Sequence, residues 1–207
     1  MTLDPFPKRE YSPADLKPIY EARPQSFELN EDWLALMARE FDTVKAATGF
    51  AEAIVGKSRE DASNIGRDFF TRYGTELMKR SLELGEEYMD RTYEVLKEAS
   101  DKTDGYLAWP LVPQRFIEAA LLSTQDALVL PTIQNSHDCY QFRVEDCRTY
   151  AALKEKCGQE VAESLPCRHG CLALIETAFR DLGLEAITSM TASVPLQDYC
   201  EFTAVRI

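Results

Sequence analysis

The sequence predicts an α+β protein, with N-terminal helices, one of them long, followed by a small, mostly antiparallel sheet with two short helices. Apolar residues recur at helical spacing over about 31–99, and short alternating stretches appear after residue 128. A chain of 207 residues is long enough for one core. We therefore expect one domain over 31–207, mainly helical over 31–125 and cysteine-rich over 126–207.

Residues 1–30 are predicted to form an extended arm, because five prolines in this stretch disfavour a continuous helix. The stretch lacks the apolar segment of a secretory signal, and no apolar run reaches the ~18 residues that a membrane span needs. We therefore expect a cytoplasmic protein whose thiols stay reduced.

Two helices are predicted before residue 100. The first covers about 31–47, with Asn30 as its cap, and Trp33 opens its apolar stripe. The second covers about 58–99 and begins at a capping serine. Because ~40 residues is far above the mean helix length, we expect a break near Gly74 or Gly85.

The rest of the chain alternates short strands and short helices. Pro131 limits its apolar run to an edge strand, whereas Cys139 starts a stretch that alternates like a half-buried strand. We predict, in order, a helix over 113–122, an edge strand over 128–133, a strand over 139–144, helices over 148–156 and 166–182, and strands over 186–194 and 199–205.

The net charge of −12 argues against two classes of partner. Nucleic acids and anionic membrane surfaces attract basic patches, and this chain is acidic. We therefore expect neither partner, and we expect a small molecule as substrate or ligand.

All six cysteines lie in the last third of the chain, and they are the main functional signal: Cys139, Cys147, Cys157, Cys167, Cys171 and Cys200. In a reducing compartment such cysteines are metal ligands, reactive thiols or small buried core residues. Three disulfides would be an alternative only for a secreted chain.

Four of these cysteines are candidate metal ligands. Cys167 and Cys171 are four residues apart at a predicted helix start, so they stack on one face, and the helix N-terminus should favour the Cys167 thiolate. Cys147 begins the preceding helix, and Cys200 lies in the last strand. Together they could surround one zinc ion or an iron–sulfur cluster, although the spacing matches no standard zinc or ferredoxin pattern.

The cysteine-rich part resembles a known family. Cys147, Cys157, Pro166-Cys167-x3-Cys171, the helix up to Gly183 and the terminal Asp198-Tyr199-Cys200-Glu201-Phe202 look like the C-terminal part of L-2-amino-thiazoline-4-carboxylic acid hydrolases. These are similar in turn to 4-vinyl reductase-like small-molecule-binding domains. The resemblance covers about residues 139–207 and implies a vinyl reductase-like fold there.

The resemblance also implies a chemistry. The hydrolases open a thiazoline ring with water, and the vinyl reductase-like sensors bind zinc through cysteines placed like Cys171 and Cys200, with further ligands in the hairpin between them. Here the hairpin over 187–193 offers no Cys, Glu or His. Cys147 and Cys167 would therefore have to supply the remaining ligands.

A second candidate group surrounds His137. His137 and Cys139 would share one face of the chain, and Trp109 could wall an apolar pocket near them. These three residues are the predicted substrate-binding set. His137 could serve as a general base, or it could be a surface loop residue.

Three functions remain open from the sequence. The first is a hydrolase or lyase that cleaves C–N or C–S bonds of a small sulfur- or nitrogen-containing molecule. It would use the cysteine-bound metal, or Cys167 as nucleophile with His169 or His137 as base. The second is a ligand-binding or sensor module with a structural metal, and the third is a [4Fe-4S] protein. The arm and the long two-striped helix suggest a homodimer.

Overall fold

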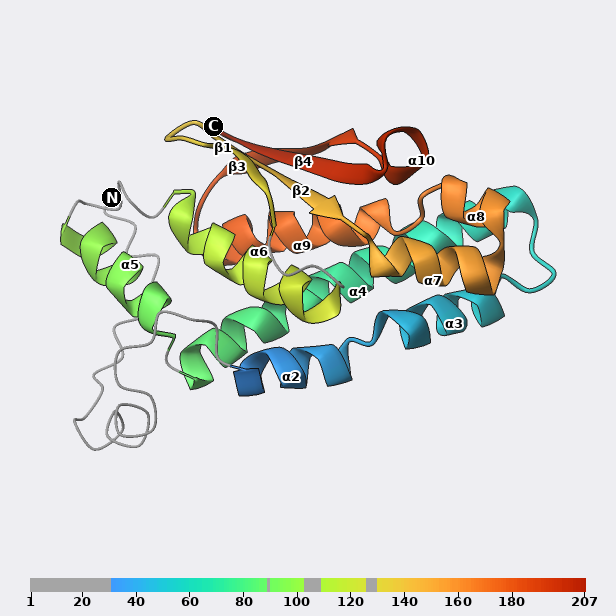
Figure 1. Cartoon of the computed structure of the whole chain (residues 1–207), viewed down its shortest axis with the longest axis horizontal. Helices are drawn as coiled ribbons and strands as arrows, with labels where there is room; N and C mark the ends of the chain where they lie inside the picture. The colour runs from blue at the N-terminus through green and yellow to red at the C-terminus, as the bar shows by residue number, and fades with distance from the viewer. Residues whose placement is uncertain (1–30, 89, 103–108, 126–129) are drawn as a thin grey trace.

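The computed structural model describes residues 31–88, 90–102, 109–125 and 130–207, so the predicted arm and Asn30 lie outside the described residues. The predicted α+β class is confirmed. Helices come first and pack on one face of a four-stranded antiparallel sheet, while no described helix covers the other face (Figure 1).

Five helices make up the first part of the described chain. Their bounds are α2 Glu31–Glu40, α3 Thr43–Ile54, α4 Arg59–Glu87, α5 Arg91–Lys102 and α6 Leu111–Thr124. The single helix predicted over 31–47 is wrong, since two helices occupy this stretch and α3 continues through Gly49. Asp42 separates them: its Oδ1 accepts hydrogen bonds from the backbone N of Val44 and of Lys45, at 2.8 and 3.1 Å, which caps α3.

The long predicted helix breaks, and the break lies just after Gly85, the second of the two predicted positions. It runs unbroken through Gly74 and Gly85, and the chain leaves the helix after Tyr88. The buried Asp90 explains the new start, because its Oδ1 accepts from the backbone N of Tyr93 at 2.7 Å and its carboxylate pairs with Arg115 at 2.6 Å. This pair ties the beginning of α5 to α6.

The second part carries the sheet and the remaining helices. The elements are β1 Thr132–Asn135, β2 Cys139–Glu145, α7 Arg148–Cys157, α8 Gln159–Glu163, α9 Arg168–Asp181, β3 Ala186–Ala192, α10 Val194–Gln197 and β4 Tyr199–Arg206. The strand order is β1-β2-β4-β3, with all neighbours antiparallel. The strands and helices predicted from residue 139 on are confirmed within a few residues, whereas α8 and the short α10 were not predicted. The edge strand predicted over 128–133 overlaps β1 only at 132–133, and residues 128–129 lie outside the described residues.

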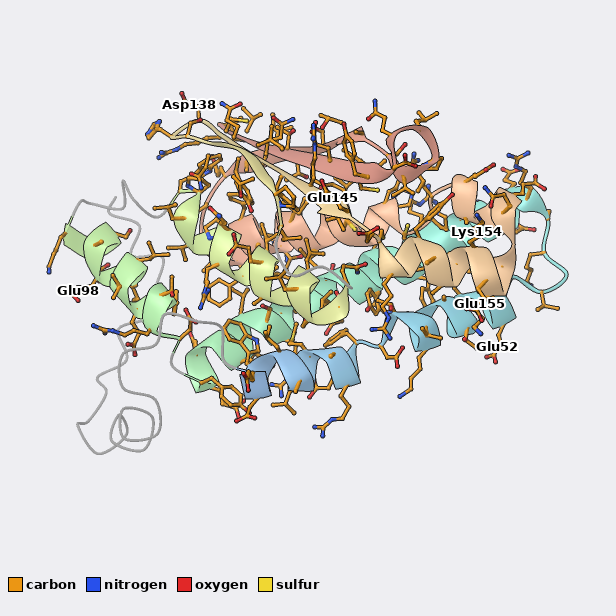
Figure 2. All side chains as sticks on the ribbon, viewed as in Figure 1. Glu52, Glu98, Asp138, Glu145, Lys154 and Glu155 are labelled. Atoms are coloured by element: carbon orange, nitrogen blue, oxygen red, sulfur yellow. The ribbon has the colours of Figure 1, made fainter. Side chains whose placement is uncertain are left out.

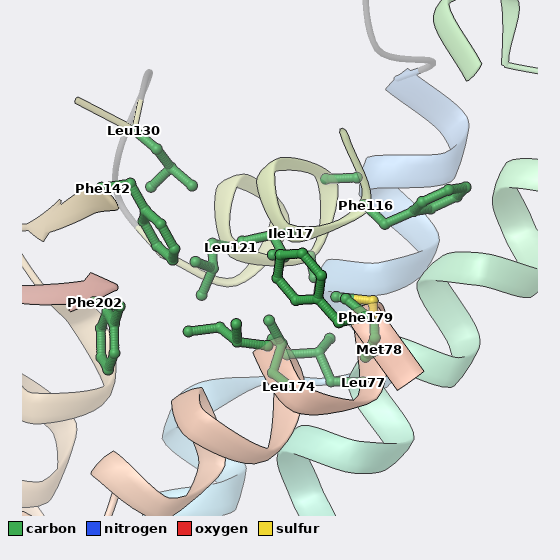
Figure 3. Close-up of a cluster of buried hydrophobic side chains, with 14 of the residues drawn as sticks. Leu77, Met78, Phe116, Ile117, Leu121, Leu130, Phe142, Leu174, Phe179 and Phe202 are labelled. Carbon is green, nitrogen blue, oxygen red and sulfur yellow. The ribbon is translucent and has the colours of Figure 1, made fainter. Parts of the chain in front are cut away.

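Strand β2 shows how the sheet faces the core. Its residues alternate between half-buried and buried, and Tyr140, Phe142 and Val144 point inward. Strand β4 runs beside it, with Phe142 opposite Phe202 and Val144 opposite Cys200. Figure 3 shows Phe142 and Phe202 next to apolar side chains of α4, α6 and α9.

The buried residues form two clusters. The larger lies between the sheet and helices α4, α6 and α9, and the smaller lies among α3, α4, α7 and the start of α9. Met190 of β3 packs against both. The candidate site lies where the two clusters meet.

Among the described residues, no helix combines the length and the apolar character needed to cross a membrane.

Candidate functional site

A small cavity lies at the junction of the two clusters. Its volume is about 30 Å³, which is about the share of one water molecule in the liquid. Residues of α4, α6, α7, α9, β2, β3 and β4 line it, and the lining is almost entirely apolar apart from its sulfur atoms. Four cysteines belong to the lining: Cys147, Cys167, Cys171 and Cys200.

Three separate segments bring these thiols to the cavity. Cys147 is the N-cap residue of α7, and its Sγ accepts a hydrogen bond from the backbone N of Tyr150 at 3.4 Å. Cys167 precedes the first residue of α9, and Cys171 follows one turn later. Cys200 lies in β4 with its side chain on the inner face of the sheet. The predicted convergence of these four cysteines on one place is therefore seen in the fold.

The two other cysteines lie elsewhere. Cys139 begins β2, where its backbone N donates to Ser136 Oγ at 3.1 Å. Cys157 ends α7, and its Sγ lies 3.9 Å from the carbonyl oxygen of Ala47. All six cysteines are free, so no disulfide forms among them.

Burial makes the four thiols hard to ionise. Burial, opposed by the hydrogen bond from Tyr150 and supported by neighbouring Cys200, raises the pKa of Cys147 to about 12. Burial likewise raises the pKa of Cys167 and of Cys171 well above the ordinary thiol value, and the neighbouring sulfurs add to the effect. In the absence of a cation, all these thiols are protonated near neutral pH.

The expected easy ionisation of Cys167 is therefore wrong. A helix N-terminus stabilises a nearby negative charge by only about 0.3–1 kcal/mol at the surface. Cys167 is 6% exposed, and the cost of removing a charge from water at such a site is several times larger. Desolvation outweighs the helix N-terminus.

The four thiols supply the right atoms for a soft metal ion but not yet its geometry. Soft sulfur donors suit zinc and iron–sulfur clusters. Within the described part of the chain, however, no three His, Cys, Asp or Glu side chains are arranged to hold a metal ion. The thiols share a cavity wall, and side-chain rotation would be needed to bring them into one coordination shell.

The two histidines lie outside this cavity. His169 follows Cys167 by two residues but lines a separate cavity. His137 lies in the β1–β2 turn, where Nδ1 is 2.7 Å from Asp138 Oδ1 and Nε2 is 2.9 Å from Arg206 Nη1. Neither imidazole is placed beside a cavity thiol, so the expected thiol–imidazole pair does not form here.

Trp109 belongs to the core. It is 3% exposed, and its ring centroid lies 5.5 Å from that of Phe179. It lines neither the thiol cavity nor the cavity beside His169. The structure therefore does not join Trp109, His137 and Cys139 into one pocket.

Sequence reasoning missed the residues that complete the cavity wall. Tyr73 of α4 lines it, and its hydroxyl donates to the carbonyl oxygen of Phe41 at 2.7 Å. Gln125 and Thr149 also line it and bond to each other, with Gln125 Nε2 3.1 Å from Thr149 Oγ1. Thr149, two residues after Cys147, is close in sequence to the cysteine signal, but nothing in the sequence links Tyr73 or Gln125 to it.

The fold and the cavity define the class: an α+β protein with a buried, thiol-lined cavity. No family model matches the chain, no curated protein matches it, and no solved structure matches it. The resemblance to the thiazoline-carboxylate hydrolases therefore remains a prediction.

Proposed function

We propose that the thiol cavity is the functional centre and that Cys147, Cys167, Cys171 and Cys200 bind a soft metal ion, with zinc as the first candidate. The carrying observation is that four thiols from three separate segments line one cavity about the size of a single water molecule. Such a volume has room for a single ion.

The raised thiol pKa values support a metal in preference to a free nucleophile. A neutral thiol is a weak nucleophile, and activation needs an adjacent base or a lowered pKa. Neither condition is met by the described residues around Cys167. A zinc ion supplies the positive charge that a buried thiolate requires. When zinc binds, the thiols therefore lose their protons to the solvent.

For activity, we propose a hydrolase or lyase that cleaves a C–N or C–S bond of a small sulfur- or nitrogen-containing molecule. This choice derives from the resemblance of the cysteine-rich part. The alternative is a sensor module in which the metal is structural, or a [4Fe-4S] protein.

The first prediction concerns metal content. Anaerobically purified protein should contain one zinc per chain by elemental analysis and should be colourless. Serine at Cys147, Cys167, Cys171 or Cys200 should weaken zinc binding in competition with a chelating dye, by roughly tenfold or more, because zinc prefers thiolate to hydroxyl ligands.

Cys139→Ser is the matched control, because Cys139 lies outside the cavity. Wild-type protein that neither contains nor takes up a soft metal would overturn the metal proposal. A brown protein that absorbs visible light would indicate an iron–sulfur cluster in place of zinc. One cavity variant that keeps full zinc affinity would mean three protein ligands and an open position, as in catalytic rather than structural zinc sites.

We further propose a cytoplasmic homodimer, as the sequence predicts. Sedimentation equilibrium of the full chain tests the dimer, and a monomer at micromolar concentration would overturn the dimer proposal.

A further inference from the structure

A second and larger cavity opens where α3 ends, α4 begins and α8 lies, at one end of the molecule (Figure 1). Its volume is about 500 Å³, within the range of about 300–1,000 Å³ that small-molecule sites occupy. Part of its lining is apolar and comes from Phe50, Ile54, Val161 and Pro166.

The charged part of this lining is mainly positive. Lys57, Arg59 and Arg168 line the cavity together with one described carboxylate, Glu160. The exposed Arg59 and Glu160 pair with each other at 3.5 Å. No ion-pair partner of the Lys57 or Arg168 side chain occurs among the residues that the structure describes.

Two uncompensated cations around one cavity contrast with the chain as a whole, which carries a net charge of −12. Like charges around a shared cavity repel each other, and an anion between them removes this repulsion. The local field of the cavity therefore attracts anions although the overall charge does not.

His169 adds an imidazole ring to the same lining. A nitrogen of this ring can form a hydrogen bond with a bound anion.

We propose that this cavity binds a small organic anion, a carboxylate or phosphate monoester that carries an apolar group. The anionic group would lie between Lys57 and Arg168, and the apolar group would pack on Phe50, Ile54 and Val161. Charge-assisted hydrogen bonds and apolar burial then contribute together.

This site is distinct from the thiol cavity but shares a wall with it. Arg168 lines both cavities, whereas Cys167 lines only the thiol cavity and His169 only the basic one. The anion site does not depend on metal binding, so its test can fail while the metal proposal stands, and the reverse.

The test is calorimetric titration of the full chain with four probes: hexyl phosphate, hexanoate, hexanol and inorganic phosphate. Hexyl phosphate or hexanoate should bind, while hexanol and inorganic phosphate should each bind at least roughly tenfold more weakly, because each lacks one of the two contributions. Whichever of hexyl phosphate and hexanoate binds more tightly identifies the preferred anionic group. Equal binding of hexanol would overturn the charge argument, and no binding of either hexyl anion would overturn the site.

Variants locate the binding. Lys57→Gln should weaken binding of the anion by roughly tenfold. Ser63→Asp adds a carboxylate to the lining and should weaken anion binding more. Both positions are exposed, so neither change disturbs the core. Lys154→Gln is the control with the same charge change on α7, outside the cavity (Figure 2). Equal affinity of Lys57→Gln and Lys154→Gln would overturn the site.

The histidine gives an independent readout. The chain has only two histidines, so in a His137→Gln variant the single remaining histidine signal in the proton spectrum belongs to His169. Bound hexyl phosphate should shift the His169 ring signal, because the ring lines the proposed site. An unchanged His169 ring signal at saturating ligand would show that the anion binds elsewhere.

Discussion

At the residue scale, Glu201 illustrates how the sheet holds a largely buried charge. Its carboxylate accepts hydrogen bonds from Gln141 at 2.7 Å, Arg143 at 2.8 Å and Thr191 at 2.9 Å. These donors join β2, β3 and β4. Burial opposes ionisation, but the hydrogen bonds from Arg143 and Thr191 outweigh it and hold the pKa of Glu201 below its ordinary value.

This network predicts a pH dependence of stability. Since the folded-state pKa is lowered, the contribution of Glu201 is present above the unfolded pKa of about 4.3 and is lost as pH falls through the folded value. Wild type should therefore lose more free energy of unfolding than Glu201→Gln between about pH 6 and pH 3. Urea unfolding at several pH values measures this difference, with exposed Glu52→Gln (Figure 2) as the control. Parallel pH curves for wild type and Glu201→Gln would contradict the prediction.

At the element scale, the packing of α4 on α9 positions the thiol cavity. The two helices touch backbone to backbone at Gly74 and Gly170: a Cβ on Gly74 would lie 1.9 Å from the Gly170 carbonyl oxygen. Both glycines line the thiol cavity, and Gly170 directly precedes Cys171 in α9. The close approach therefore sets the distance between α4 and the cysteines of α9.

Gly74→Ala should destabilise the protein by about 3 kcal/mol, because α4 and α9 must move apart and the core must be repacked. Gly49→Ala in α3 is the matched control: its Cβ would make only an ordinary contact with Phe69 at 3.9 Å. It should stabilise α3 by about 0.5–1 kcal/mol, as alanine favours helix over glycine. Chemical unfolding compares both variants, and a neutral Gly74→Ala would contradict the observed helix contact.

At the scale of the whole molecule, the thiol cavity joins two core clusters. Cys167 belongs to the smaller cluster and Cys200 to the larger one, while Cys147 and Cys171 pack against the larger one. A metal ion there would link α7, α9 and β4 through their cysteines. The proposed metal would therefore stabilise the domain as well as the site.

Metal removal should consequently lower the free energy of unfolding of the whole chain. A ligand that binds only the folded state stabilises it by about 2.7 kcal/mol at a hundredfold excess over its Kd. Chelator treatment should lower the Tm of wild type and leave that of Cys147→Ser nearly unchanged. If the chelator leaves the wild-type Tm unchanged as well, the cavity holds no stabilising metal.

The sequence predicted the elements better than their ends. Alternation over 139–144 and the Gly158 and Gly183 stop signals placed β2, α7 and α9 within a few residues. The break after α4 falls just beyond Gly85, as predicted, but not at the glycine itself. The helix in fact tolerates Gly74 and Gly85, since neighbouring groups pack on them, and the Asp90–Arg115 pair starts the next helix.

By itself, the sequence determined the α+β class, the order of the elements and the concentration of thiols in the last third, because these depend on local periodicity and composition. Only the tertiary structure decided that Cys147, Cys167, Cys171 and Cys200 line one cavity while Cys139 and Cys157 do not. It also decided that burial raises the pKa of Cys167 and that Lys57 and Arg168 line one cavity. Burial and the distances between remote segments arise from long-range packing, which no local pattern encodes.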